Sequence, residues 1–142
     1  MRFCEVAEFL TDLPDGAVED PDGPDFLVWP GRPALEAIGE ILGELGCDLE
    51  PIESAEFKGW ELSFRYRGRW LWMRVTRIER HVAAFADRNL WPGIIGRVHP
   101  HYLELLSRLG EALARDPRFH EVQWFILDEF EPTLTGDPAA AD

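Results

Sequence analysis

Hydrophobic and polar residues alternate most regularly between positions 58 and 78 of the chain. Two stretches rich in aromatic and branched residues flank Gly68-Arg69, and a two-residue type II′ turn favours glycine at its first central position. With that turn, Arg67 is expected opposite Trp70. Because side chains alternate across a strand, one face of the hairpin is then apolar and consists of Trp60, Leu62, Phe64, Tyr66, Leu71, Met73 and Val75. A slip of one residue would destroy that face, so the pattern predicts a β-hairpin over 58–78.

Helical periodicity predicts two principal helices, over residues 33–45 and 102–114. Pro33 suits the first turn of a helix, and a glycine such as Gly46 commonly follows a helix end. The apolar stripe of the first helix consists of Leu35, Ile38, Leu42 and Leu45. The stripe of the second helix consists of Tyr102, Leu105, Leu106, Leu109 and Leu113. Each helix has one apolar face, so we expect both to pack on one face of the sheet.

Shorter patterns complete the expected fold. Apolar residues spaced at i, i+3, i+4 and i+7 predict a short N-terminal helix that contains Phe3, Val6, Ala7 and Leu10. Short strands are expected at 26–29, 49–52 and 119–127. One further helix is expected near 79–87, and an acidic loop at 12–25. Together the patterns predict an α+β domain over residues 1–130, with a mainly antiparallel sheet and a frayed C-terminal tail at 131–142.

The composition supports a folded single domain. The chain has 142 residues, of which 46% are hydrophobic and 12% aromatic, so it can bury roughly 70% of the surface that its unfolded form exposes. The N-terminal residues lack the uninterrupted apolar run of a signal peptide, and no stretch has the roughly 18 apolar residues of a membrane span. We therefore expect a cytoplasmic protein in which Cys4 and Cys47 are reduced, with a single disulfide as the open alternative.

The charge of the chain is both large and uneven. The chain carries 27 acidic and 14 basic side chains, a net charge of −13. Residues 1–57 have a net charge of −13, residues 58–101 of +6 and residues 102–142 of −6. A negative surface argues against a general binder of nucleic acid or membranes, since both of these ligands are anionic. It favours instead a partner protein with a basic surface, and a homo-oligomer stays open.

The polar face of the predicted hairpin is the first candidate binding site. Its distinctive side chains are Arg65, Arg67, Trp70, Trp72 and Arg74. Arginine packs favourably over tryptophan, and both residue types are common anchors of protein interfaces. Three interpretations stay open: another segment of the chain covers this face, with the arginines paired to its acidic loops; a partner protein binds it; or it stacks nucleobases or an anionic ligand.

An acidic stripe on the first predicted helix is the second candidate. Glu36, Glu40 and Glu44 follow one another at intervals of one helical turn, so their side chains share one face. Like charges at this spacing repel each other slightly. The stripe is interpreted either as a solvated helix face or as a surface that meets a basic partner.

Motifs for catalysis are absent from the sequence. No serine lies in a GxSxG context, and no glycine-rich phosphate-binding loop occurs. The His99-Pro100-His101 triplet supplies two potential metal ligands where zinc needs three or four, so we expect neither a metal nor a cofactor. A pocket between the hairpin and the apolar loop at 82–101 is the alternative site, with Arg88, Arg97, His99 and His101 as its polar residues.

These observations favour a non-catalytic protein-binding module over an enzyme. The chain shares the general character of bacterial immunity and antitoxin proteins, a small, acidic, tryptophan-rich α+β domain without a catalytic signature. We therefore expect an acidic protein-binding module of immunity, antitoxin or adaptor type. The alternative is a small-molecule-binding domain or an enzyme that uses the pocket beside the hairpin.

Overall fold

The computed structural model describes residues 4–55, 59–77, 79–87 and 99–126. The strands of the large sheet are β1 (Cys4–Thr11), β4 (Asp48–Leu49), β5 (Glu53–Ala55), β6 (Gly59–Tyr66), β7 (Arg69–Arg77), β8 (His81–Asp87) and β9 (Phe119–Ile126). A separate two-stranded sheet consists of β2 (Val18–Glu19) and β3 (Phe26–Val28). The helices in the described part are α1 (Arg32–Glu44) and α2 (Pro100–Arg115). The expected α+β class, with a mainly antiparallel sheet and two helices, is confirmed.

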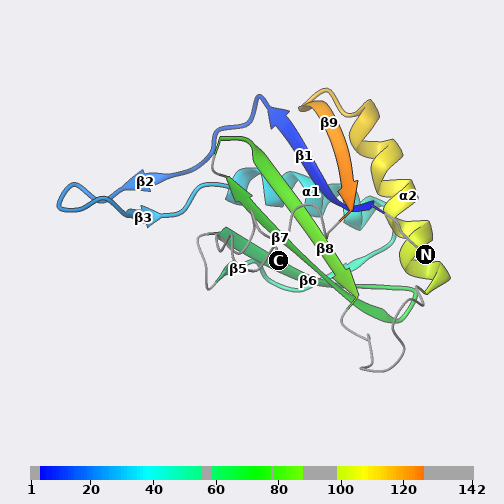
Figure 1. Cartoon of the computed structure of the whole chain (residues 1–142). Coiled ribbons are helices and arrows are strands. Elements are labelled where there is room, and N and C mark those ends of the chain that lie inside the picture. Colours follow the sequence, from blue (N-terminus) through cyan, green and yellow to red (C-terminus); the bar gives the residue numbers. More distant parts are fainter. Residues whose placement is uncertain (1–3, 56–58, 78, 88–98, 127–142) are drawn as a thin grey trace, which may run out of the picture.

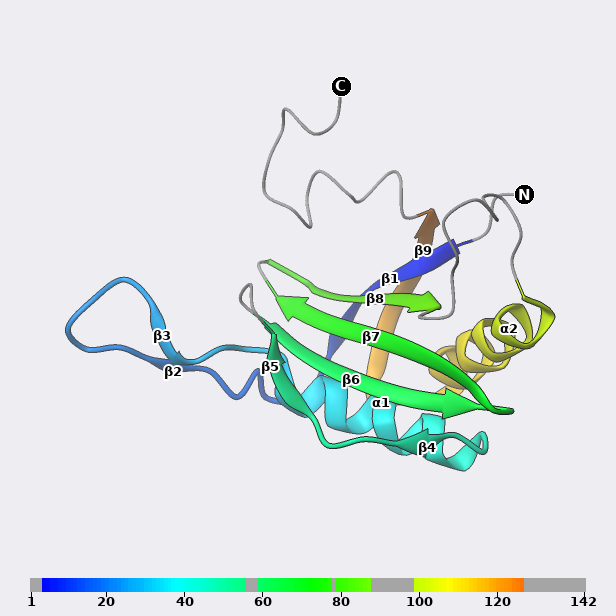
Figure 2. The same cartoon turned by 90° about the horizontal axis from the view of Figure 1, so that it is seen from below.

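The large sheet has the strand order β4-β6-β7-β8-β1-β9, and β5 also pairs with β6. All its pairings are antiparallel. Both helices pack against one face of this sheet, which Figures 1 and 2 show from two directions. The largest fully buried side chains come from both helices and from that face, among them Phe9, Leu35, Ile38, Phe64, Leu71, Met73, Phe85, Leu105 and Leu109. We call this face the inner face and the opposite one the outer face.

The turn between β6 and β7 differs from the predicted one. Its central residues are Arg67 and Gly68, both with positive φ angles of 51° and 79°, as a type I′ turn requires. Tyr66 therefore pairs with Arg69, and the predicted pairing of Arg67 with Trp70 is wrong by two residues in register. Because side chains alternate with a period of two, a shift by two leaves every side chain on its face. The buried residues of β6 and β7 are Gly59, Leu62, Phe64, Tyr66, Leu71, Met73 and Val75.

Two predicted helices are wrong, because their residues form β1 and β8. In β1, Val6, Ala7 and Phe9 are fully buried although neighbouring residues face opposite sides of the sheet. In β8, Ala83 and Ala84 are likewise both buried. A central strand that is covered on both faces carries apolar residues at adjacent positions. Such spacing resembles the spacing of an amphipathic helix, which explains the error.

The predicted acidic loop at 12–25 contains part of a short β-ribbon. Val18 pairs with Val28 and Glu19 with Phe26, and the ribbon extends away from the large sheet (Figures 1 and 2). We call residues 17–28 the arm. The expected strand at 49–52 is replaced by β4 and β5, which lie on either side of Pro51. Proline has no N–H group for a ladder hydrogen bond, so it interrupts a strand readily.

Cys47 is a free and buried cysteine, so it forms no disulfide with Cys4. Burial raises the pKa of its thiol to about 12, which keeps the group protonated at neutral pH. No helix in the described ranges is long and apolar enough to cross a membrane. The predicted tail at 131–142 lies outside the described residues.

Candidate functional site

The outer face of β6 and β7 carries an alternating ladder of arginine and tryptophan side chains. Arg65 pairs across the strands with Trp70, and its guanidinium carbon lies 5.3 Å from the Trp70 ring centroid. Farther along, the guanidinium carbon of Arg74 lies 5.2 Å from the Trp72 ring centroid. Arg74 also donates a hydrogen bond of 2.8 Å to Glu61, its cross-strand partner. We call Arg65, Trp70, Trp72 and Arg74 the Arg–Trp ladder.

Each arginine of the predicted binding face has a carboxylate partner nearby. Arg65 lies 3.7 Å from a carboxylate oxygen of Asp48, and Arg74 is paired with Glu61. Arg67, in the turn, donates to Glu104 of α2 at 3.1 Å. These acids belong to β4, β6 and α2, and none of the three described pairs involves the acidic loop at 12–25. The side chains of Arg65 and Arg67 keep exposed fractions of 46% and 52%, so the pairs leave both guanidinium groups accessible to solvent.

The three glutamates of the acidic stripe are all exposed on α1, but they differ in their contacts. Glu36 accepts a hydrogen bond of 3.0 Å from Arg32, one turn earlier. Glu40 accepts one of 3.0 Å from Arg118, which follows α2. Glu44 has no ion pair within the described part of the chain. At Glu36 and Glu44 the stripe is therefore exposed surface of α1. At Glu40 it belongs to a junction between α1 and the segment that follows α2.

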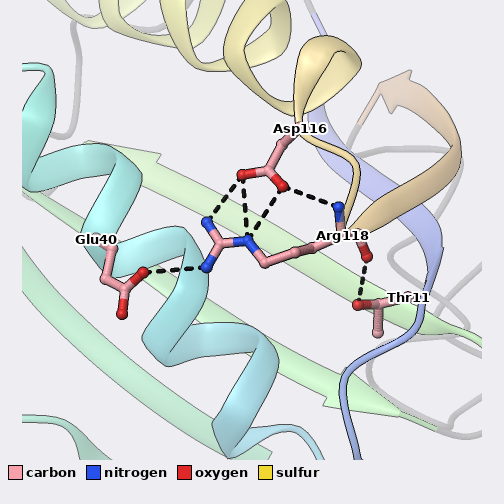
Figure 3. Close-up of polar contacts among 4 residues, drawn as sticks. All are labelled: Thr11, Glu40, Asp116 and Arg118. Atoms are coloured by element: carbon pink, nitrogen blue, oxygen red, sulfur yellow. Dashed lines mark hydrogen bonds and ion pairs between the residues drawn. The ribbon is translucent and has the colours of Figure 1, made fainter.

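Arg118 is the centre of that junction (Figure 3). It donates to both carboxylate oxygens of Asp116, with a shortest distance of 2.8 Å from Nη2, while Nη1 reaches Glu40. Its carbonyl oxygen accepts a hydrogen bond of 2.7 Å from the Thr11 hydroxyl. The Arg118 side chain holds the pKa of Asp116 below its ordinary value, chiefly through these hydrogen bonds. The contacts connect α1, the end of α2 and β1, so Glu40 contributes to the fold as well as to the acidic surface.

The histidines of the predicted alternative pocket lie at the N-terminus of α2. His99 is the N-cap residue, and its Nδ1 accepts a hydrogen bond of 3.1 Å from the backbone N–H of His101. The two rings are 4.7 Å apart between centroids. Partial burial lowers the pKa of His99, and the nearby positive charge of Arg69 lowers it further. Arg88 and Arg97 of the predicted pocket lie outside the described residues.

Two partly buried polar pairs lie beside these histidines and were not predicted as a site. Arg69 donates a 2.6 Å hydrogen bond to Asp87 at the end of β8, and the Asp87 side chain is only 6% exposed. The Tyr102 hydroxyl donates to Glu5 of β1 at 2.8 Å. Burial raises the pKa of Tyr102, and the carboxylates of Glu5 and Asp87 raise it further. We call Glu5, Arg69, Asp87, His99 and Tyr102 the polar cluster.

The polar cluster could bind a small polar ligand, but its geometry lacks a nucleophile activated by a base. Each carboxylate already accepts a hydrogen bond from a neighbouring side chain. No group of three or more His, Cys, Asp or Glu side chains in the described ranges could hold a metal ion. Sequence reasoning missed Glu5 because it placed this residue in a helix. A strand at 4–11 would have put Glu5 on the same face as the buried Ala7 and Phe9, and a carboxylate there is unusual.

Comparison with known proteins adds no relative. No family model, curated protein or solved structure matches this chain. A function therefore has to be inferred from the Arg–Trp ladder, the acidic surfaces and the polar cluster.

Proposed function

We propose that this protein is a non-catalytic protein-binding module of immunity, antitoxin or adaptor type, acting in the cytoplasm. The Arg–Trp ladder carries the proposal. It lies on the face of β6 and β7 turned away from both helices, and tryptophan and arginine dominate the binding energy of protein interfaces. The contacts of Arg65 with Trp70 and of Arg74 with Trp72 and Glu61 hold these side chains in place. Because these side chains are already held, they lose less conformational entropy on binding a partner than flexible side chains would.

The acidic surfaces select the partner in this proposal. The net charge is −13, and Glu36 and Glu44 extend an exposed negative face along α1. A basic partner is attracted by this field before contact, which raises the association rate more than the lifetime of the complex. We assign affinity to the Arg–Trp ladder and steering to the acidic surfaces.

Partner capture with ladder variants tests the proposal. Wild type and Trp72→Ala are immobilised, and captured proteins are identified and then titrated in purified form. We expect Trp72→Ala to weaken binding by about tenfold or more, as for an interface anchor. Trp72→Phe, which keeps an aromatic ring beside Arg74, should lose much less. If no protein is captured and a small ligand instead raises the melting temperature, the module proposal is wrong.

The polar cluster supports a second candidate, a site for a small polar molecule. Its five side chains converge beside the N-terminus of α2, and Asp87 and Tyr102 are strongly buried. Ligand sites place a few polar groups in an otherwise apolar wall, and the inner face supplies such a wall. A thermal-shift screen with wild type and Tyr102→Phe tests this. A ligand that stabilises wild type but not Tyr102→Phe would support the second candidate.

A further inference from the structure

We propose that the arm, residues 17–28, is a docking element for a basic protein surface that carries exposed apolar side chains. The inference rests on the proposed function, because it assumes a protein partner. It adds a second contact region, remote from the Arg–Trp ladder, and it specifies what the partner presents there.

The base of the arm is firmly attached to the domain. Asp15 accepts a 2.8 Å hydrogen bond from the Gly31 N–H at its carbonyl oxygen, and its carboxylate lies 3.4 Å from Arg77. On the other side, Trp60 donates its indole N–H to the carbonyl oxygen of Trp29 at 2.8 Å. Beyond these contacts the ribbon extends away from the large sheet (Figures 1 and 2). A ribbon fixed at its base is presented in a defined direction, so a partner does not have to order it from a free chain.

The arm exposes apolar side chains that the rest of the described surface mostly conceals. Leu27 has an exposed fraction of 65% and Val18 one of 47%, the two largest among the big hydrophobic residues described. Both lie outside the hydrophobic core. A two-stranded ribbon has no interior of its own in which to bury them. Burying a leucine side chain against a partner contributes roughly 1.5–3 kcal/mol, so a partner with apolar residues gains from this contact.

The charges of the arm define the sign of that partner. The arm contains four acidic side chains and no basic one, and the acids are Glu19, Asp20, Asp22 and Asp25. None of them forms an ion pair with a described basic residue, whereas Glu61 and Glu104 on the body do. Unpaired exposed acids attract a basic surface and repel nucleic acid, anionic lipid and a second copy of this chain. The partner that fits both observations is a protein surface with lysine or arginine around apolar residues.

Two synthetic peptides test the inference directly by calorimetric titration. Both are lysine-rich and equal in length and charge, but one has interspersed leucines where the other has serines. We expect wild type to bind the leucine peptide about tenfold more tightly than the serine peptide. Leu27→Ser should reduce that preference to within about threefold. Combined Asp22→Asn and Asp25→Asn should weaken binding of both peptides by roughly tenfold, because two attractive charges are lost.

The matched control is the combined variant Glu50→Gln and Glu53→Gln, which makes the same charge change at two exposed positions, one just before β5 and one at its start. It should weaken binding of either peptide by less than about twofold. Equal weakening by the two pairs, an unchanged leucine preference in Leu27→Ser, or no binding by wild type would each overturn the inference. The proposed function has a separate readout in the capture experiment with Trp72→Ala. If the peptide experiment contradicts the role of the arm, the proposal for the Arg–Trp ladder is therefore unaffected. If the capture experiment fails while wild type still discriminates between the two peptides, the ladder proposal is contradicted and the role of the arm is not.

Discussion

The β6–β7 hairpin and the arm are both two-stranded antiparallel ribbons, yet one belongs to the core and the other extends from it. The hairpin has eight cross-strand pairs and further strands on both sides, and Phe64 and Leu71 pair with each other beneath the helices. The arm has two pairs and, among the described residues, no strand on either side. Its side chains at Val18 and Leu27 are exposed.

The two ribbons also differ in the contacts that their charged side chains make. Arg65 and Arg74 on the hairpin each meet a carboxylate and a tryptophan, whereas the acids of the arm have no basic partner in the described ranges. Neighbouring strands and helices stabilise the hairpin, whereas hydrogen bonds and an ion pair at the base of the arm attach the arm to the domain. Stability should therefore depend on the hairpin, and binding on the exposed surfaces of both.

Truncating a buried side chain of the hairpin should have the largest effect on stability. Phe64→Ala removes a ring that is 1% exposed and leaves a cavity between β6 and the helices. We expect the free energy of unfolding to fall by about 3–5 kcal/mol. Urea unfolding followed by circular dichroism measures this value, with an unchanged m-value as the sign that the native fold persists. A loss below about 1 kcal/mol would mean that the hairpin is not the centre of the core.

Acid should weaken the end of the sheet to which the arm is attached, through His81. This residue is buried against Phe9, its charged neighbours are Arg77 and Asp15, and its Nε2 has no described hydrogen-bond partner. Burial, followed by the positive charge of Arg77, lowers its pKa from 6.5 to about 4. The folded protein resists protonation of His81 more than the unfolded chain does. The contribution of neutral His81 to the free energy of unfolding is therefore complete above pH 6.5 and is lost as the pH falls toward 4.

The expected loss over this interval is up to about 3 kcal/mol, since each unit of pKa difference corresponds to roughly 1.4 kcal/mol. Unfolding experiments at several pH values should show it in wild type. His81→Phe keeps a ring beside Phe9 and should remove the dependence between pH 6.5 and 4. An equal slope in His81→Phe would assign the acid sensitivity to other groups.

The hairpin also shows how far the sequence predicts this fold. Alternation placed the side chains of β6 and β7 correctly on their faces, because that information is local and periodic. The turn was assigned one residue away, which moves the strand register by two, since glycine suits both a II′ turn at Gly68-Arg69 and the observed I′ turn at Arg67-Gly68. A non-glycine residue at positive φ is uncommon, so Arg67 was not expected there.

The misassigned elements and the polar cluster depend on long-range contacts. β1 lies between β8 and β9, and nothing local in its sequence indicates that both its faces are covered. The pairs of Tyr102 with Glu5 and of Arg118 with Glu40 join residues 97 and 78 positions apart. Periodicity cannot predict such pairs, because their proximity follows from the order of strands in the sheet. The ladder was predicted because its members lie within one hairpin.

Glycine substitutions in the turns of the two ribbons should have a smaller effect on the free energy of unfolding, and this effect should differ between the hairpin and the arm. Gly68 has a φ of 79° and nothing within 4 Å of an added Cβ, so Gly68→Ala introduces backbone strain without a steric clash. We expect a loss of about 1 kcal/mol in the free energy of unfolding. Gly23 in the arm has no positive φ, and the nearest atom to an added Cβ would be 3.6 Å away. Gly23→Ala should be neutral or stabilise by up to about 0.5 kcal/mol. Thermal unfolding of both variants measures the contrast, and equal losses would contradict it.

The smallest effect on stability is expected from the exposed side chains of the arm. Leu27→Ala removes apolar atoms that are already exposed, and it creates no cavity. Asp22→Asn combined with Asp25→Asn removes two acids without a described basic partner from a negatively charged chain. Both changes should alter the free energy of unfolding by less than about 0.5 kcal/mol, as is usual for surface positions. Urea unfolding under the conditions used for Phe64→Ala gives the comparison. A loss of more than about 1 kcal/mol in Leu27→Ala would mean that this side chain packs against the protein itself, and the arm would then be a stabilising element rather than a surface for a partner.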